Sequence, residues 1–210
     1  AITYNEGRVT VTSNKTIYCY LYFDLDKVLP QVFTFYLGGS SNPTYTNTVS
    51  TSAYLSFADT DIKEYCLTTE SDNINCTWNE VSETSIEVDY TLANGDGTKT
   101  VNAYLRDYAG NVSPEVSDSI ILDTTPPENN SISINNNAAY TTSTGVTLTL
   151  SSNGATEMCI SNTETCTSWE TYSTSKSHTL ASGLGTKTVY VQYKDAAGNI
   201  SSAVSDTISL

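Results

Sequence analysis

Acidic side chains are the residues of this sequence best suited to chemistry, because carboxylates bind cations or act in pairs as acid and base. Calcium needs several hard oxygen ligands, and five carboxylates fall in turn-like segments or near a Pro-Pro pair: Asp59, Asp61, Asp107, Asp123 and Glu128. Their spacing matches neither an EF-hand nor a nonapeptide repeat. Calcium is the strongest cofactor candidate, and a solvated acidic surface with no cofactor is the alternative.

Catalysis has weaker support. The single histidine, His178, has no nucleophile motif near it, so the sequence does not support a catalytic triad. Carboxylates are numerous enough for a glycosidase by inventory alone. Most of them lie in turn-like contexts, however, and the short repeats described next offer no obvious cleft. We expect no enzymatic activity.

The elements that position these residues follow from an internal repeat. Three motifs recur with an offset of 88 residues: Gly-Thr-Lys-Thr-Val at 97–101 and 185–189, Asp-x-Ala-Gly-Asn at 107–111 and 195–199, and Val-Ser-Asp at 116–118 and 204–206. Between the copies lies Asp-Thr-Thr-Pro-Pro at 123–127. A Pro-Pro pair cannot continue a strand ladder, so this segment indicates a short, semi-rigid joint. A weaker joint is predicted at 29–31.

Apolar and polar residues alternate with period 2, as in Val101, Ala103 and Leu105, and no stretch has a convincing helical period. Short strands of this kind, separated by Asn-Gly, Asp-Gly and Ala-Gly-Asn turns, predict a β-sandwich. The Asp-x-Ala-Gly-Asn motif fits a structural turn, because Asp and Asn hydrogen-bond nearby backbone and Gly supplies a positive φ.

Together, the Gly-Thr-Lys-Thr-Val, Asp-x-Ala-Gly-Asn and Asp-Thr-Thr-Pro-Pro motifs resemble the tandem Ig-like (fibronectin-III-like) repeats of large bacterial and archaeal surface proteins. The resemblance implies an all-β fold with two tandem Ig-like β-sandwiches, at 31–124 and 125–210. An N-terminal β-hairpin or partial repeat at 1–30 precedes them. The family implies extracellular stalks, adhesins and surface layers, but no single activity.

The five cysteines include one left over. Cys66 and Cys76 stand in equivalent places to Cys159 and Cys166, and a Trp follows each pair within three residues. Two disulfides drawn from five cysteines allow fifteen patterns, and the repeat equivalence selects Cys66–Cys76 and Cys159–Cys166. Disulfides of this kind indicate an oxidising, extracytoplasmic compartment. Zinc is disfavoured, because the chain has no Cys-x-x-Cys and only one histidine.

Residues 1–30 resemble part of a third repeat, since Lys-Thr-Ile-Tyr-Cys-Tyr-Leu at 15–21 aligns with 99–105 and 187–193. The preceding residues 8–12 and a turn at 13–14 fit a hairpin arm. One face of this segment would present Ile17, Cys19, Leu21 and Phe23, and the other would present Tyr18, Tyr20 and Tyr22. Such a hairpin needs a partner. It folds back on its own first repeat, donates a strand to a neighbouring subunit, or is a fragment of a longer array. Cys19 is a buried apolar thiol or forms an intermolecular disulfide.

Charge and hydropathy exclude further classes. The chain has 210 residues and a formal net charge of −14, so its surface repels phosphate backbones and argues against nucleic acid. No run of about 18 apolar residues exists, so we expect no membrane span. The chain begins at Ala1 without Met or a basic leader, which indicates a mature, processed protein. If the source glycosylates asparagine, five Asn-x-Ser/Thr sequons are acceptors: Asn14, Asn75, Asn111, Asn129 and Asn199.

The leading hypothesis is a structural subunit of an extracellular filament or cell-surface assembly. It would self-associate by β-strand complementation through the N-terminal segment. The first alternative is a stalk or adhesin module of a longer surface protein that binds a surface glycan or protein. The second is an accessory module of a secreted polysaccharide-active enzyme.

Overall fold

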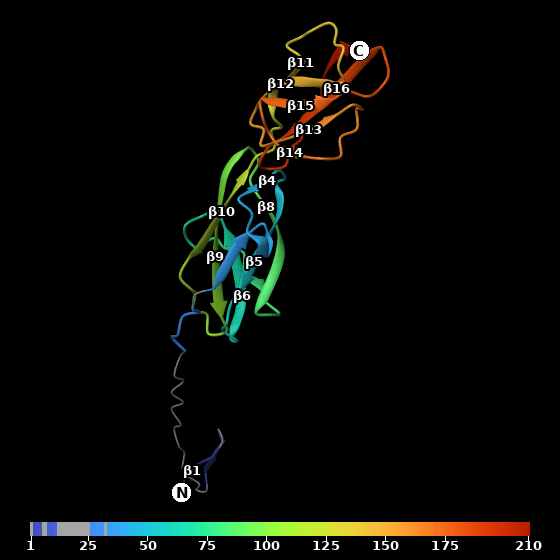
Figure 1. The fold of residues 1–210 in the computed structure, drawn as a ribbon. Coiled ribbons are helices and arrows are strands. Elements are labelled where there is room, and N and C mark those ends of the chain that lie inside the picture. The colour runs from blue at the N-terminus through green and yellow to red at the C-terminus, as the bar shows by residue number, and fades with distance from the viewer. Residues whose placement is uncertain (1, 6–7, 12–25, 32) are drawn as a thin grey trace.

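The computed structural model describes residues 2–5, 8–11, 26–31 and 33–210, and it is nearly all β (Figure 1). One 3-10 turn, η1 (Gly39–Ser41), is the only helical element among these residues. The predicted all-β class is confirmed. The described residues contain no helix that is long and apolar enough to cross a membrane.

The first repeat has a three-stranded sheet facing a five-stranded sheet. The smaller sheet has the order β3 (Thr34–Leu37), β5 (Ser50–Ser56), β8 (Ser85–Thr91). The larger has the order β4 (Tyr45–Thr46), β10 (Val116–Leu122), β9 (Gly97–Asp107), β6 (Ile62–Thr68), β7 (Asn79–Glu80). All the strand pairs are antiparallel except β10 with β4, where Ile121 pairs with Tyr45 in parallel.

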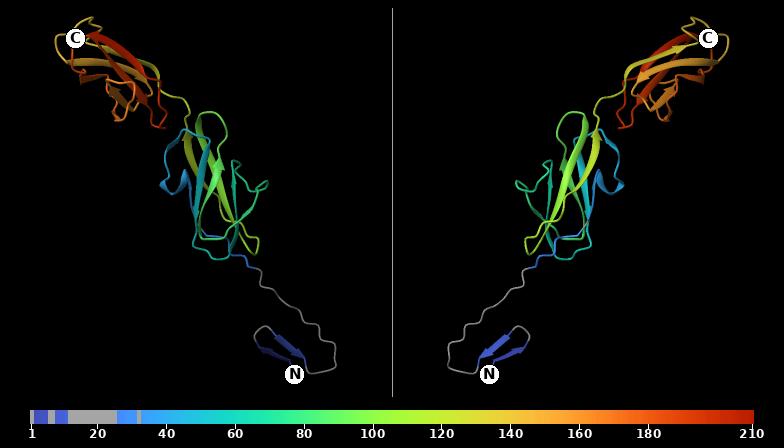
Figure 2. Two further views of the ribbon diagram at one scale, coloured as in Figure 1. Left: turned by 90° about the vertical axis from the view of Figure 1, so that its right-hand side faces the viewer. Right: turned by 90° about the vertical axis from the view of Figure 1, so that its left-hand side faces the viewer.

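The second repeat has the same plan with one edge strand fewer, because a single bridge between Tyr140 and Ser209 takes the place of β4. One sheet has the order β11 (Glu128–Ile134), β12 (Gly145–Asn153), β15 (Ser175–Thr179). The other has the order β14 (Glu170–Thr171), β13 (Glu157–Ser161), β16 (Thr186–Lys194), β17 (Val204–Ser209). Figures 1 and 2 show the two sandwiches arranged end to end, with residues 123–127 between them.

Each sandwich has its own hydrophobic core, because the inward positions of its strands alternate with outward ones. In β12, Val146, Leu148 and Leu150 are buried and the residues between them are exposed. The first core contains residues between Phe33 and Leu122, and the second contains residues between Ile134 and Ile208. The two cores share no residue. The exact domain boundaries at 31–124 and 125–210 remain a prediction.

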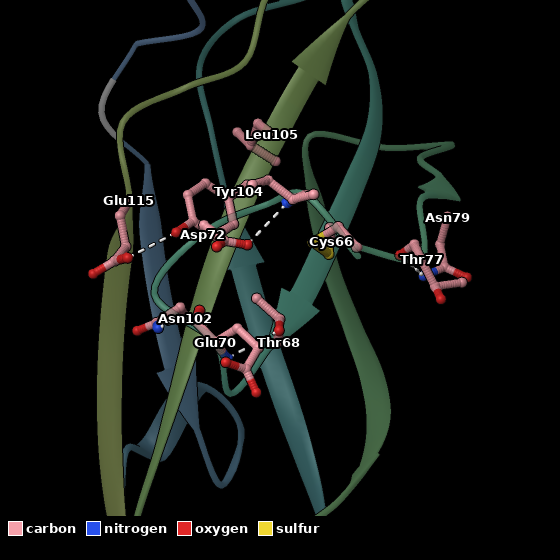
Figure 3. Close-up of a disulfide and its surroundings, with 12 residues drawn as sticks. Cys66, Thr68, Glu70, Asp72, Thr77, Asn79, Asn102, Tyr104, Leu105 and Glu115 are labelled. Atoms are coloured by element: carbon pink, nitrogen blue, oxygen red, sulfur yellow. Dashed lines mark hydrogen bonds between the residues drawn. A yellow bond between two sulfur atoms is a disulfide. The ribbon is translucent and has the colours of Figure 1, made fainter.

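The β9 strand departs from the predicted alternation. Asn102 and Tyr104, which were expected on the outer face, are buried together with Val101, Ala103 and Leu105. The reason is the loop after β6, which covers this face. The Asn102 amide donates to the Glu70 carbonyl at 2.8 Å, and the Tyr104 hydroxyl donates to Glu115 Oε2 at 2.7 Å (Figure 3).

The recurring Val-Ser-Asp motif joins the two sheets of each sandwich. Asp118 on β10 accepts a hydrogen bond from the Leu37 amide at 2.7 Å, and Asp206 on β17 accepts one from the Ile134 amide at 2.8 Å. A carboxylate therefore satisfies a backbone donor where the first strand of each repeat leaves its sheet. The sequence showed the repetition of this aspartate but not its partner.

The N-terminal hairpin pairs other residues than expected. β1 (Ile2–Asn5) and β2 (Arg8–Val11) pair antiparallel, and they form a two-stranded sheet of their own. The sequence paired 8–12 with the residues after a turn at 13–14. The structure instead pairs Arg8 with Asn5 and Val11 with Ile2. The expected second arm lies outside the described residues.

Candidate functional site: the joints between repeats

The Asp-x-Ala-Gly-Asn motif forms a closed turn at one end of each sandwich. In the first repeat, Asp107 is buried, and its two carboxylate oxygens accept from the Asn111 backbone amide and the Asn111 side-chain amide, both at 2.8 Å. Gly110 has φ 92°, a left-handed conformation that L side chains rarely adopt. The second repeat repeats this geometry, with Asp195 and Asn199 bonded at 2.9 Å and 2.9 Å. The predicted turn role of these residues therefore fits the geometry.

The asparagine of this turn also binds the joint that leads into its own repeat. The Asn199 side-chain amide donates to the Asp123 carbonyl at 2.7 Å, so its two N–H groups join Asp195 to the joint. Asn199 is 9% exposed. Because Asn199 and Asp195 are both buried, these bonds set where the chain enters the second sandwich. We call residues 123–127 the inner joint.

The first repeat holds the inner joint from the opposite side. Asp96 accepts from the Thr124 amide at 2.9 Å, from the Thr124 hydroxyl at 2.8 Å and from the Thr125 hydroxyl at 2.6 Å. These bonds hold the pKa of Asp96 below its ordinary value, with the Thr125 hydroxyl as the largest cause. The Asp123 amide donates to the Thr46 carbonyl at 2.9 Å. The joint is therefore bonded to both sandwiches.

The residues before the first sandwich form a joint with the same bonds. Asn111 donates its side-chain amide to the carbonyls of Asp26 at 3.1 Å and Val28 at 3.2 Å. The Val28 amide donates to Asp26 Oδ1 at 2.9 Å, just as the Thr125 amide donates to Asp123 Oδ1 at 3.1 Å. We call residues 26–30 the outer joint. It begins three residues before the weak joint predicted at 29–31, and it matches the inner joint at an offset of 97 residues.

Each sandwich thus has two distinct ends. The entry end contains the Asp-x-Ala-Gly-Asn turn and receives a joint. The exit end contains the loop before β9 or β16, which has Asp96 in the first repeat, and it releases the next joint. At the inner joint, the Asn47 amide nitrogen of the exit end lies 3.7 Å from where a Cβ would sit on Gly198 of the entry end. The two ends therefore approach closely.

The predicted calcium ligands are only partly brought together. Asp61 and Asp107 lie with Asp26 at the outer joint, where one carboxylate oxygen of each lies within 4.8 Å of the others. Asp59 instead accepts from the Gln31 amide at 2.7 Å, and Asp123 accepts from Thr125. Glu128 is exposed at the start of β11. Asp26 is a ligand candidate that could not be selected from the sequence, because it lies before the joint predicted at 29–31. Calcium binding stays a prediction.

The two disulfides have the pairing expected from the repeat. Cys66 bonds Cys76 (Figure 3) and Cys159 bonds Cys166, with Cα atoms 5.9 Å and 6.0 Å apart. The tryptophan after each disulfide packs against a cationic side chain of β9 in the first repeat and of β16 in the second. Arg106 lies 4.2 Å from the Trp78 ring centroid and Lys194 lies 4.7 Å from that of Trp169.

Each of these cations also pairs with a glutamate of the neighbouring strand. Arg106 donates to Glu64 at 2.8 Å, and Lys194 pairs with Glu157. The Arg106 guanidinium holds the pKa of Glu64 below its ordinary value. The sequence predicted a packed Trp beside each disulfide, and the cation–π contact adds its partner.

The five sequons occupy different environments. Asn75 and Asn129 are exposed, whereas Asn111 and Asn199 use their side-chain amides in the joints. A glycan attached to Nδ2 would remove one of those donor hydrogens. Asn14 lies outside the described residues. Glycosylation stays a prediction at Asn75 and Asn129, and the joint bonds argue against it at Asn111 and Asn199.

The single histidine has structural partners. His178 lies on β15, where its Nε2 is 3.0 Å from Asn162 Oδ1, and burial lowers its pKa. The only hydrogen-bond partner described for its ring is this amide, which is not part of an acid–base pair. The predicted subunit-interface residues are Ile17, Tyr18, Cys19, Tyr20, Leu21, Tyr22 and Phe23, and all lie outside the described residues.

No family model matches the sequence, and no curated protein is significantly similar to it. Among solved structures, the chain is similar to the fibronectin(III)-like modules of Clostridium thermocellum CbhA. That match has a TM-score of 0.50 and 8% identity, and covers 84% of this chain and 94% of the other. The two repeats are fibronectin-III-like sandwiches. The resemblance inferred from the sequence motifs is thereby confirmed at the level of the fold.

Two further matches are weaker. The central fibronectin-III array of RIM-binding protein gives a TM-score of 0.29 at 11% identity, with 87% of this chain and 69% of that chain covered. The BSP domain of a biofilm-associated protein gives 0.26 at 12% identity, with 87% and 29% covered. The fold assignment rests on the CbhA modules alone.

Proposed function

We propose that this chain is a non-enzymatic structural subunit of an extracellular filament or cell-surface assembly. The observation that carries the proposal is the repeated joint. Asn111 and Asn199 each bind the joint that enters their own repeat, so the outer joint is built for an element ahead of the first sandwich. Two disulfides support an oxidising compartment. Joints that are hydrogen-bonded to the neighbouring sandwiches suit a protein that has to keep its domains in a fixed orientation or bear force along its length.

We further propose that subunits polymerise by β-strand complementation through residues 1–30. Because 26–30 match 123–127, residues 19–25 correspond in sequence to β10, the last strand of the first repeat. This register supports the donation of residues 19–25 as the last strand of a sandwich. The alignment of residues 15–21 with 99–105 would instead make the segment equivalent to β9, the strand before the last. Phe23 then corresponds to Ile120 and Leu25 to Leu122, both of which are buried in the first core. Leu21 corresponds to Asp118, so the match is not complete.

Deletion of residues 1–25 tests this proposal and keeps the outer joint. Light scattering under non-reducing conditions should show polymer or a ladder of species for 1–210, and loss of the long species for 26–210. Circular dichroism and a cooperative unfolding transition would verify that both sandwiches remain folded. A truncated chain that polymerises like the full chain would refute strand complementation.

The outer joint also favours a second candidate function, a stalk or adhesin module within a longer repeat array. In that case, residues before Asp26 belong to a preceding repeat of the same polypeptide. The reading frame distinguishes the two. Further Asp-Thr-Thr-Pro-Pro repeats flanking this sequence would support the stalk, and a stop codon soon after Leu210 would support the subunit.

A further inference from the structure

Among the described residues, five of the eight large exposed apolar side chains lie at the two outer ends of the molecule, and the other three are Tyr45, Ile74 and Ile200. At the exit end of the second repeat, Leu184 is 92% exposed and Tyr140 is 79% exposed. At the entry end of the first repeat, Tyr108 is 72% exposed and Val28 of the outer joint is 67% exposed. Exposed apolar groups collected in this way are typical of interaction surfaces.

Two of these residues, Leu184 and Tyr108, differ from their counterparts in the other repeat, whereas Tyr140 has an equivalent tyrosine, Tyr45, in the first repeat. Leu184 stands where the first repeat has Asp96, which binds Thr124 and Thr125 at the inner joint. Tyr108 stands where the second repeat has Ala196, in the turn that approaches Asn47. The inner joint is therefore polar and internally bonded, whereas the same positions at the outer ends are apolar and exposed.

Charge does not oppose contact between the two outer ends. Residues 31–124 contain 14 acidic and 3 basic residues, and residues 125–210 contain 6 acidic and 3 basic residues. The entry end of the first repeat includes Asp26, Asp59, Asp61 and Glu83. The exit end of the second repeat comes from 135–144 and 180–187, which contain no acid and one lysine, Lys187. Two entry ends would repel each other, but an exit end can approach an entry end.

The entry end also has a hollow that could accept a side chain. It measures about 210 Å³ and lies between the loops before β6 and β8 and the turn after β9. Phe57, Ile62 and Val81 supply apolar walls, and Tyr108 stands at the rim. An apolar residue on a projecting loop, such as Leu184, has the right chemistry to enter it.

We propose that a second copy of this chain docks head to tail, with the exit end of its second repeat, at Leu184 and Tyr140, against the entry end of the first repeat, at Tyr108 and this hollow. In this contact an exit end meets an entry end, as at the inner joint, but the two ends belong to different subunits. It is heterologous, so it cannot close a two-fold dimer, and it extends into a filament when the rotation between subunits does not close a ring. This inference rests on the proposed function, because a donated strand at 1–25 would bring the same two ends together.

The repeats themselves supply the test substitutions. Leu184→Asp and Tyr108→Ala each install the residue that the other repeat has at that position, so both should fold. Sedimentation of the full chain should show self-association weakened about tenfold or more by either change, as expected for a central apolar contact. Ile74→Asp is the matched control, because Ile74 is exposed apolar surface on the disulfide loop, away from both ends. Unchanged association for both end variants would overturn the proposal.

Mixed crosslinking gives a second measurement that is independent of affinity. In a Cys19→Ser background, a Leu184→Cys chain mixed with a Tyr108→Cys chain should form a disulfide-linked heterodimer. Mixing Leu184→Cys with Ile74→Cys should form little. Equal yields in the two mixtures would contradict the head-to-tail arrangement.

The two proposals fail in different ways. If deletion of residues 1–25 abolishes all association and Leu184→Asp has no effect in the full chain, strand complementation stands and the end contact is refuted. If the deletion leaves association unchanged and Leu184→Asp removes it, the end contact stands and strand complementation is refuted. If the flanking gene supplies more repeats and the full chain stays monomeric at all concentrations, both self-association proposals are refuted.

Discussion

The inner joint provides the sharpest test of the structure, through Asn199→Ala. The substitution removes the side-chain bond to the Asp123 carbonyl and the side-chain bond to Asp195, but keeps the backbone bond to Asp195. A neutral hydrogen bond contributes about 0.5–1.5 kcal/mol net, and one to a charged group about 1.5–3 kcal/mol. We therefore expect the second repeat to lose about 2–4.5 kcal/mol of unfolding free energy. The part that restrains the joint is the smaller share.

The assay must read orientation as well as stability. Residual dipolar couplings measured on both sandwiches should fit a single relative orientation in the wild type and require averaging in Asn199→Ala, while urea unfolding reports the loss in stability. Asn111→Ala is the matched control, because it breaks the same turn in the first repeat and leaves the inner joint intact. If Asn199→Ala still fits a single relative orientation, or if Asn111→Ala requires as much averaging as Asn199→Ala, the assignment of Asn199 to the joint is refuted.

Three further predictions concern the joints and the disulfides. Because the pKa of Asp96 is lowered in the folded chain, its bonds to Thr124 and Thr125 stabilise the joint at pH values above 3.8, the pKa in the unfolded chain. This stabilisation is lost as the pH falls through the lower pKa of the folded chain. Dipolar couplings should therefore show more orientational averaging at pH 3 than at pH 6, and an Asp96→Asn chain should show the same averaging at both. Titration calorimetry should find one calcium ion per chain, bound at Asp26, Asp61 and Asp107, because the second repeat has Gly154 in place of Asp61. The dissociation constant should be about 0.1–1 mM, as in extracellular modules. No heat from the wild type, or the same heat from Asp61→Asn, would refute this prediction. Replacing Cys159 and Cys166 together by Ala should destabilise the second repeat by about 2–3 kcal/mol in urea unfolding, from the entropy of a short closed loop, with the first repeat unchanged; an equal loss in both repeats would contradict independent cores.

Most of the fold could be predicted from local pattern. Alternation in segments such as 101–105 and 147–150 defined strands, because side chains of a strand point to opposite faces and one face must be buried. The 88-residue offset defined two similar sandwiches, and cysteine equivalence selected the disulfide pairing. The prediction was wrong about the outer face of β9, since a loop from elsewhere in the chain buries Asn102 and Tyr104.

The candidate site was harder to predict than the fold. Both asparagines of the joints were visible as repeated turn residues, and their closing bonds to Asp107 and Asp195 are local. Their bonds to Asp26, Val28 and Asp123 link residues 76 to 85 positions apart. Only the closure of a sandwich brings such residues together, and a single sequence contains no record of it.

The sequence by itself determined the all-β class, the tandem repeat, the turn chemistry of Asp-x-Ala-Gly-Asn and the pairing of the two disulfides. These properties depend on near neighbours or on the comparison of one repeat with the other. The tertiary structure decided which carboxylates converge, which face of each turn meets a joint, and which apolar side chains remain exposed at the outer ends. These properties depend on contacts between distant segments, and burial of the two cores fixes those contacts only when the whole sandwich has closed.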